Sequence, residues 1–113
     1  TAVLHVPPHI LRASVLEREL VLPYREALEL VDVARRSRVL ILGWEGWLRY
    51  PDGALGHATH QGTVSLNDLS VREAADLVAS TIRDDYAHWR REPHEEELLF
   101  CITIDGEYDE AIA

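Results

Sequence analysis

The residues best suited to chemistry in this chain gather between Gly43 and Gly62, in the stretch GWEGWLRYPDGALGHATHQG. Two tryptophans, a glutamate and two histidines stand there among five glycines. A carboxylate beside an imidazole is a pair that general acid–base catalysis uses, whereas tryptophan and arginine are residue types that protein interfaces favour. The stretch therefore indicates either an active site or a binding face, and the elements that carry it decide which side chains meet.

The motif YPDGA, residues 50–54, predicts the tight turn of a β-hairpin. Pro51 presets the first turn position, and Gly53 supplies the left-handed residue of a three-residue loop. With Tyr50 opposite Ala54, this turn fixes the register of the two strands. The predicted cross-strand pairs are Trp47 with His57, Glu45 with Thr59, and Trp44 with His60.

This register divides the side chains of the hairpin between two faces, because successive residues of a strand point to opposite sides. The apolar face, which suits a cover of helices, carries Leu40, Leu42, Trp44, Leu48 and Tyr50 opposite Val64, Gly62, His60, Gly56 and Ala54. The mixed face carries Val39, Ile41, Glu45, Trp47 and Arg49 beside His57, Thr59, Gln61, Thr63 and Ser65. Glycines opposite Trp44 or its neighbours are interpreted as room for the indole, and a bulge at Gly46 would change the facing of Glu45 or Trp47.

Glu45 and His57 lie close enough in this register to act as an acid and a base, with Thr59 and Gln61 beside them. The hypothesis of a small enzyme rests on this pair, although no nucleophile or oxyanion hole accompanies it. His57 and His60 do not share a metal ion, because their odd separation sends them to opposite faces of the strand. We predict no metal site and no cofactor, since no glycine-rich phosphate loop joins a strand to a helix.

The sequence predicts two helices and three strands, and two of these strands form the hairpin. Ser70 and Glu73 form a capping box that opens a helix, which Pro93 ends, and an earlier helix runs from Pro23 to Arg36. Strands are predicted in residues 38–50, 56–66 and 97–104, the last of which is apolar enough to be buried on both faces. We expect at least one further strand in residues 1–22, where tandem prolines interrupt the first candidate and residues 10–20 also fit a helix.

The resulting order, β-α-β-β-α-β, predicts an α+β fold. We expect a two-layer sandwich with a mainly antiparallel sheet and two helices on one face, ferredoxin-like or related. The chain has 113 residues and no linker, so residues 1–113 are predicted to form a single domain.

The composition narrows the classes of partner. A formal net charge of −9 disfavours nucleic acid and suits a basic partner. No run approaches the roughly 20 apolar residues that cross a bilayer, so we expect no membrane partner and a cytoplasmic location. Cys101 is the single cysteine, and its apolar neighbours predict a small buried side chain rather than a reactive thiol.

The stretch VLILGWEGWLRYPDG, followed by GH, GTVSL and a capped helix, resembles a small bacterial family of immunity proteins from toxin systems. The resemblance covers roughly residues 23–105 and contains no catalytic signature. It implies a cytoplasmic, acidic, single-domain protein that binds and neutralises a partner.

The leading hypothesis is a small acidic protein-binding module, of the immunity or inhibitor kind, with a toxin as one type of partner. The residues expected to bind are Glu45, Trp47, Arg49, His57, Thr59 and Gln61. Two alternatives stay open: a small enzyme that uses Glu45 and His57, and a structural homodimer joined through a patch of His57, Trp47 and Ile41.

Overall fold

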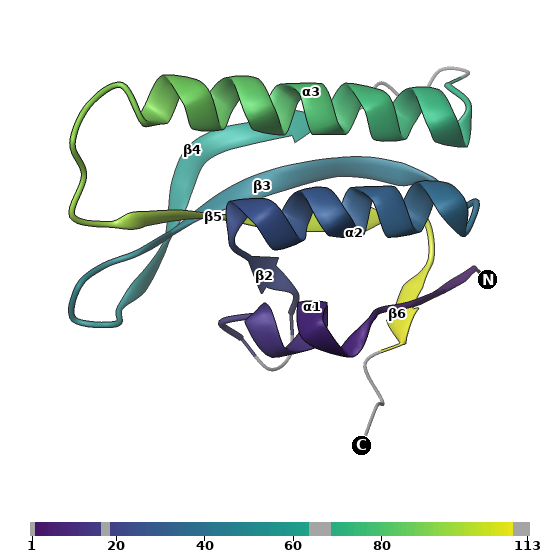
Figure 1. Ribbon diagram of the computed structural model, residues 1–113, viewed down its shortest axis with the longest axis horizontal. Coiled ribbons are helices and arrows are strands. Elements are labelled where there is room, and N and C mark those ends of the chain that lie inside the picture. The colour runs from purple at the N-terminus through teal and green to yellow at the C-terminus, as the bar shows by residue number, and fades with distance from the viewer. Residues whose placement is uncertain (1, 17–18, 64–68, 110–113) are drawn as a thin grey trace.

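A computed structural model of the chain describes residues 2–16, 19–63 and 69–109 (Figure 1). Its elements are β1 (Val3–His5), α1 (Pro8–Ala13), β2 (Val21–Leu22), α2 (Tyr24–Arg36), β3 (Ile41–Arg49), β4 (Leu55–Thr63), α3 (Val71–Trp89), β5 (Glu97–Ile104) and β6 (Glu107–Asp109). Four strands form an antiparallel sheet in the order β2-β5-β3-β4, and β1 pairs with β6 in a separate parallel sheet. The predicted α+β class and the mainly antiparallel sheet are confirmed.

The observed order of elements is longer than the predicted β-α-β-β-α-β, because β1 and α1 precede β2 and because β6 follows β5. Every neighbouring pair in the four-stranded sheet is antiparallel, and β5 lies between β2 and β3. The predicted order and the ferredoxin-like arrangement are therefore not confirmed. α2 and α3 lie side by side against one face of the sheet (Figure 1), as expected for two helices on one side.

The main core lies between this sheet and the two long helices. The alternation of β5 directs Leu98, Phe100 and Ile102 toward the helices, where all three are buried. The Phe100 ring lies 5.2 Å from the Trp44 ring and 6.1 Å from the Tyr24 ring, centroid to centroid. β5 is a central strand of the sheet, but the predicted burial on both of its faces holds only in part, because Thr103 is exposed and Glu97 and Cys101 are half-buried.

The helices begin and bury their faces largely as their sequences predict. The Ser70 hydroxyl accepts a hydrogen bond from the Glu73 amide at 3.1 Å, and the Glu73 carboxylate accepts one from the Ser70 amide at 3.1 Å, so the capping box is confirmed. On α2, the buried residues are Ala27, Leu30, Val31, Val33 and Ala34. α1 also packs against α2, and Val33 lies beside Ile10 of α1.

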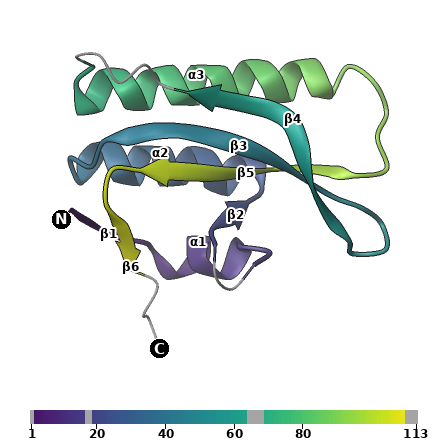
Figure 2. The same ribbon diagram turned by 180° about the vertical axis from the view of Figure 1, so that it is seen from behind.

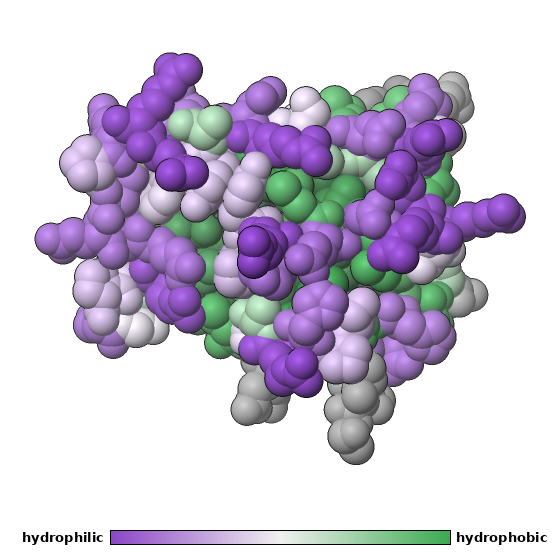
Figure 3. Space-filling view, in the orientation of Figure 1, coloured by the Kyte–Doolittle hydropathy of each residue, from purple (hydrophilic) through white to green (hydrophobic). Residues whose placement is uncertain are grey.

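The outer surface of the helical layer is mainly hydrophilic, and apolar side chains show between the helices (Figure 3). A groove between α2 and α3 has the apolar lining residues Leu28, Val31, Ala75 and Ala79, with Asp32, Arg35, Asp76 and Arg83 also lining it. Because charges of both signs border this groove, it has no clear electrostatic preference. Among the described residues, no helix has both the length and the apolar content that spanning a membrane requires.

Candidate functional site

The hairpin turn has the predicted geometry. The Tyr50 amide donates to the Ala54 carbonyl at 2.8 Å, and the Gly53 amide donates to the Tyr50 carbonyl at 2.8 Å. Gly53 has a φ of +88°, which explains why a residue without Cβ stands there. The pairing of Trp47 with His57 is confirmed.

Beyond Trp47 the predicted register is wrong, because β4 contains additional residues at this point. Glu45 lies opposite Gln61 rather than Thr59, and Trp44 lies opposite Gly62 rather than His60. Between these pairs and Trp47, β3 contributes only Gly46, whereas β4 contributes residues 58–60. The β4 backbone passes so close to Gly46 that a Cβ there would lie 2.9 Å from the His60 carbonyl oxygen.

This irregularity leaves Glu45 and Trp47 on the same face. β3 pairs with β5 without interruption from Gly43 to Arg49, so the extra residues bend β4 and not β3. A bulge at Gly46 would have moved Glu45 or Trp47 to the other face. The structure keeps both side chains on one face, because the extra residues belong to β4.

A second irregularity, between Ile41 and Gly43, corrects the predicted start of the strand. Val39 and Ile41 were expected on the mixed face, but both are buried in the main core. The pairing of β3 with β5 shifts at this point, which reverses the facing of the residues before it. The predicted patch of His57, Trp47 and Ile41 therefore does not form.

Tyr50 is a further correction, because it was expected on the helix-covered side and is 43% exposed. The tip of the hairpin extends beyond both long helices (Figure 1), so no helix covers it. The partners predicted for residues 39 and 40, Val64 and Ser65, lie outside the described residues.

Trp44 belongs to the helix-covered side of the sheet. Its indole N–H donates to the Thr81 hydroxyl at 2.9 Å, and only 4% of the residue is exposed. A Cβ on Gly62 would lie 2.4 Å from the indole nitrogen. The prediction that a glycine makes room for the indole is confirmed, although Gly62 was expected opposite Leu42.

No helix of the described residues lies over the opposite side of the four-stranded sheet (Figure 2), and we name this side the helix-free face. Strand pairing and alternation place on it Val21, Glu45, Trp47, Arg49, His57, Thr59, Gln61, Glu97, Leu99 and Cys101. All six predicted binding residues thus lie on one face. Their neighbours from β2 and β5 were not predicted.

Trp47 is the largest side chain of the helix-free face. Its ring lies 4.3 Å from the His57 ring, at an interplanar angle of 45°, and the residue is partly exposed. Its cross-strand neighbour on β5 is Leu99, which is fully buried. The indole nitrogen is buried, and within the described part of the chain it has no hydrogen-bond partner.

Charge is distributed unevenly over the helix-free face. Arg49 forms an ion pair with Glu97, its cross-strand neighbour. Glu45 is exposed, and no cation among the described residues forms an ion pair with it. Burial, followed by the charges of Glu19 and Glu45, raises the pKa of the Cys101 thiol to about 11, so the thiol stays protonated at neutral pH.

The proposed acid–base pair is not assembled in this geometry. Glu45 faces Gln61, whereas His57 faces Trp47, and the extra residues of β4 separate the two rows. No hydrogen bond or ion pair joins Glu45 to His57 in the described residues. His60 lies on the other side of the strand, where its Nδ1 is 3.8 Å from a carboxylate oxygen of Asp85 on α3.

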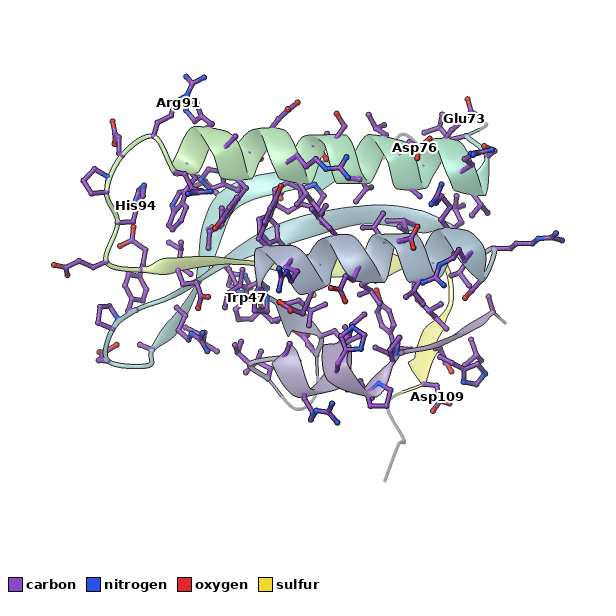
Figure 4. The ribbon with its side chains drawn as sticks, viewed as in Figure 1. Trp47, Glu73, Asp76, Arg91, His94 and Asp109 are labelled. Atoms are coloured by element: carbon purple, nitrogen blue, oxygen red, sulfur yellow. The ribbon has the colours of Figure 1, made fainter. Side chains whose placement is uncertain are left out.

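A second group of polar side chains, at the end of α3, has a structural explanation. Nδ1 of His94 lies 2.7 Å from a Glu96 carboxylate oxygen, and Nε2 lies 2.8 Å from the Trp89 carbonyl oxygen. The imidazole also stacks on the Trp89 indole at 4.2 Å. Figure 4 shows His94 in the loop after α3, where these contacts close the turn toward β5.

Comparison with known proteins adds no relative: no protein-family model, curated protein or solved structure matches the chain.

The residues that the sequence analysis missed come from β2 and β5. The alternation of Glu97, Leu99 and Cys101 was visible in the sequence, and it identifies one face of that strand. What the sequence did not reveal was that β5 lies next to β3, which brings these residues beside Trp47.

Proposed function

We propose that this protein is a small protein-binding module and that the helix-free face, centred on Trp47, is its binding surface. The observation that carries the proposal is Trp47 itself: a partly exposed indole, supported by His57 and Leu99, on a sheet face without helices. Aromatic and arginine side chains supply much of the binding energy at protein interfaces.

The proposed partner is a protein that this module neutralises, such as a toxin, and the proposed site of action is the cytoplasm. The resemblance of roughly residues 23–105 to immunity proteins supports this type of partner. The net charge of −9 supports it as well, because an acidic surface attracts a basic partner and accelerates their encounter.

The test is capture of a partner from the native host on immobilised protein, followed by binding measurements with Trp47→Ala and Glu45→Ala. We expect Trp47→Ala to weaken binding about 10-fold or more, as truncation of a central aromatic residue does at other interfaces. Leu77→Ala and Asp76→Ala are the matched controls, since both residues are exposed on α3. Full retention of binding by Trp47→Ala and Glu45→Ala would exclude the helix-free face.

A homodimer is a distinct outcome of the same experiments. If the captured partner is a second copy of the chain, the mass in solution will rise with concentration, and Trp47→Ala will lower it. A monomeric mass across a wide concentration range, together with capture of another protein, agrees with the proposed function.

A further inference from the structure

The helix-free face carries rows of side chains that run across the strands, and these rows differ in charge. The row at the hairpin end contains Arg49 and Glu97, which neutralise each other. The middle row contains His57, Trp47 and Leu99. The third row, listed from β4 to β2, consists of Gln61, Glu45, Cys101 and Val21.

Glu45 in the third row, and Glu19 near its β2 end, carry negative charge that the described residues do not balance. Glu45 is the cross-strand neighbour of Cys101, and Glu19, which is also exposed, stands two residues before Val21, the other neighbour of Cys101. Both carboxylates act on the Cys101 thiol, whose pKa is raised by burial and then by Glu19 and Glu45. Neither carboxylate forms an ion pair with a described cation, whereas Arg49 is already paired.

We propose that the helix-free face binds a basic side chain of the partner protein, an arginine or a lysine, which lies between Glu45 and Glu19 and against Trp47. This inference rests on the proposed function and specifies the chemistry of the partner. A guanidinium or ammonium group supplies the charge that the third row lacks, and its aliphatic stem fits the apolar surface of Trp47. An indole beside the cation adds a favourable electrostatic contact.

The test uses a tetra-arginine peptide as the probe and nuclear magnetic resonance titration of the full chain as the readout. We expect the peptide to shift the signals of Glu45, Gln61 and the Trp47 indole N–H, and a tetra-glutamate peptide to leave them unchanged. The shifts should weaken at high salt, because the charges on both sides are solvent-exposed.

Two double variants separate the proposed site from the general charge of the chain. Glu19→Gln with Glu45→Gln removes the two negative charges that act on Cys101 of the helix-free face, and Asp76→Asn with Asp84→Asn removes two from α3. Figure 4 shows Asp76 on α3, in the helical layer. We expect the first double variant to raise the apparent Kd for the peptide about 10-fold and the second to change it less than about twofold.

Equal weakening in both double variants, or shifts that map to the helical layer, would overturn the inference. Its failure differs from failure of the proposed function. If the peptide does not bind the face but Trp47→Ala still weakens capture of the native partner, the function stands and the basic contact is wrong. If the peptide binds the face but the native partner binds Trp47→Ala and Glu45→Ala fully, the proposed function is wrong.

Discussion

Trp44 and Trp47 stand three residues apart on β3, yet they lie on opposite faces of the sheet. The Trp44 indole N–H reaches Thr81 on α3, and its ring packs against Phe100. The Trp47 indole N–H has no acceptor in the described residues, and its ring packs against the exposed His57. Buried polar groups in stable cores are normally paired. The helix-covered side therefore contributes a paired indole to the core, whereas the indole N–H on the helix-free face is buried without a partner in the described residues.

The largest expected difference in stability comes from truncating one aromatic residue on each side of the sheet. Phe100→Ala should lower the free energy of unfolding by about 3–5 kcal/mol, because it removes a fully buried ring from the contact with Trp44 and Tyr24. Trp47→Ala should lower it by only about 1–2 kcal/mol, since the indole is partly exposed and its N–H is unpaired. Urea unfolding measures both values, and equal losses would contradict the division.

Two glycines of β4 offer a matched pair of substitutions, with the next largest expected change in the free energy of unfolding. Gly62→Ala should cost about 1–3 kcal/mol, because its Cβ would lie 2.4 Å from the Trp44 indole nitrogen, and the buried ring has little room to move. Gly56→Ala should cost well under about 1 kcal/mol, because its nearest neighbour would be a Tyr50 ring carbon at 3.5 Å. Thermal unfolding of the two variants should show a lower Tm for Gly62→Ala alone.

The two indole N–H groups can be compared directly. Thr81→Val removes the acceptor of the Trp44 indole and should cost about 1–2 kcal/mol, because a buried donor then stays unpaired. Trp47→Phe removes a donor that already lacks a partner, so it should cost less than Thr81→Val despite the smaller ring. Chemical denaturation gives both differences. A larger loss for Trp47→Phe would show that its N–H has an acceptor in solution.

Local chemistry made part of this structure predictable from the sequence. The turn at Pro51 and Gly53, the capping box at Ser70 and the buried run of residues 97–104 each depend on neighbours close in the chain. The gathering of Glu45, Trp47, Arg49 and His57 on one face was also predicted, since strand parity needs only the turn as a starting point.

The remaining features depend on contacts between distant residues. The extra residues of β4 beside Gly46 change the pairing of β3 with β4, and the shift after Ile41 changes the pairing of β3 with β5. No single residue type in the sequence predicts either irregularity. β5 pairs with β3 although the two strands are far apart in the chain, and this pairing places Leu99 beside Trp47 and Cys101 beside Glu45. The helix α1 was left open against a strand, because tandem prolines fit both a strand end and a helix start.

The smallest expected effect concerns the acid stability of the helical layer. Hydrogen bonds from the Ser70 backbone, and then from its side chain, lower the pKa of the Glu73 carboxyl below its ordinary value of 4.5. A carboxyl whose pKa is lower in the folded state stabilises the fold above its unfolded pKa, and this stabilisation is lost as the pH falls through the folded pKa. Glu73→Gln should therefore be less stable than the native chain near pH 7, and the difference should shrink below about pH 4.5.

Glu92→Gln is the control for this last comparison, since it removes one negative charge from an exposed position just beyond α3 without touching the capping box. Urea unfolding of the three proteins between pH 7 and pH 3 measures the differences. A gap between the native chain and Glu73→Gln that stays constant over this range would show that the ionised carboxylate does not stabilise the start of α3. A gap that closes for Glu73→Gln alone would assign the acid-sensitive part of the stability to the helix cap, on the side of the sheet that the helices cover.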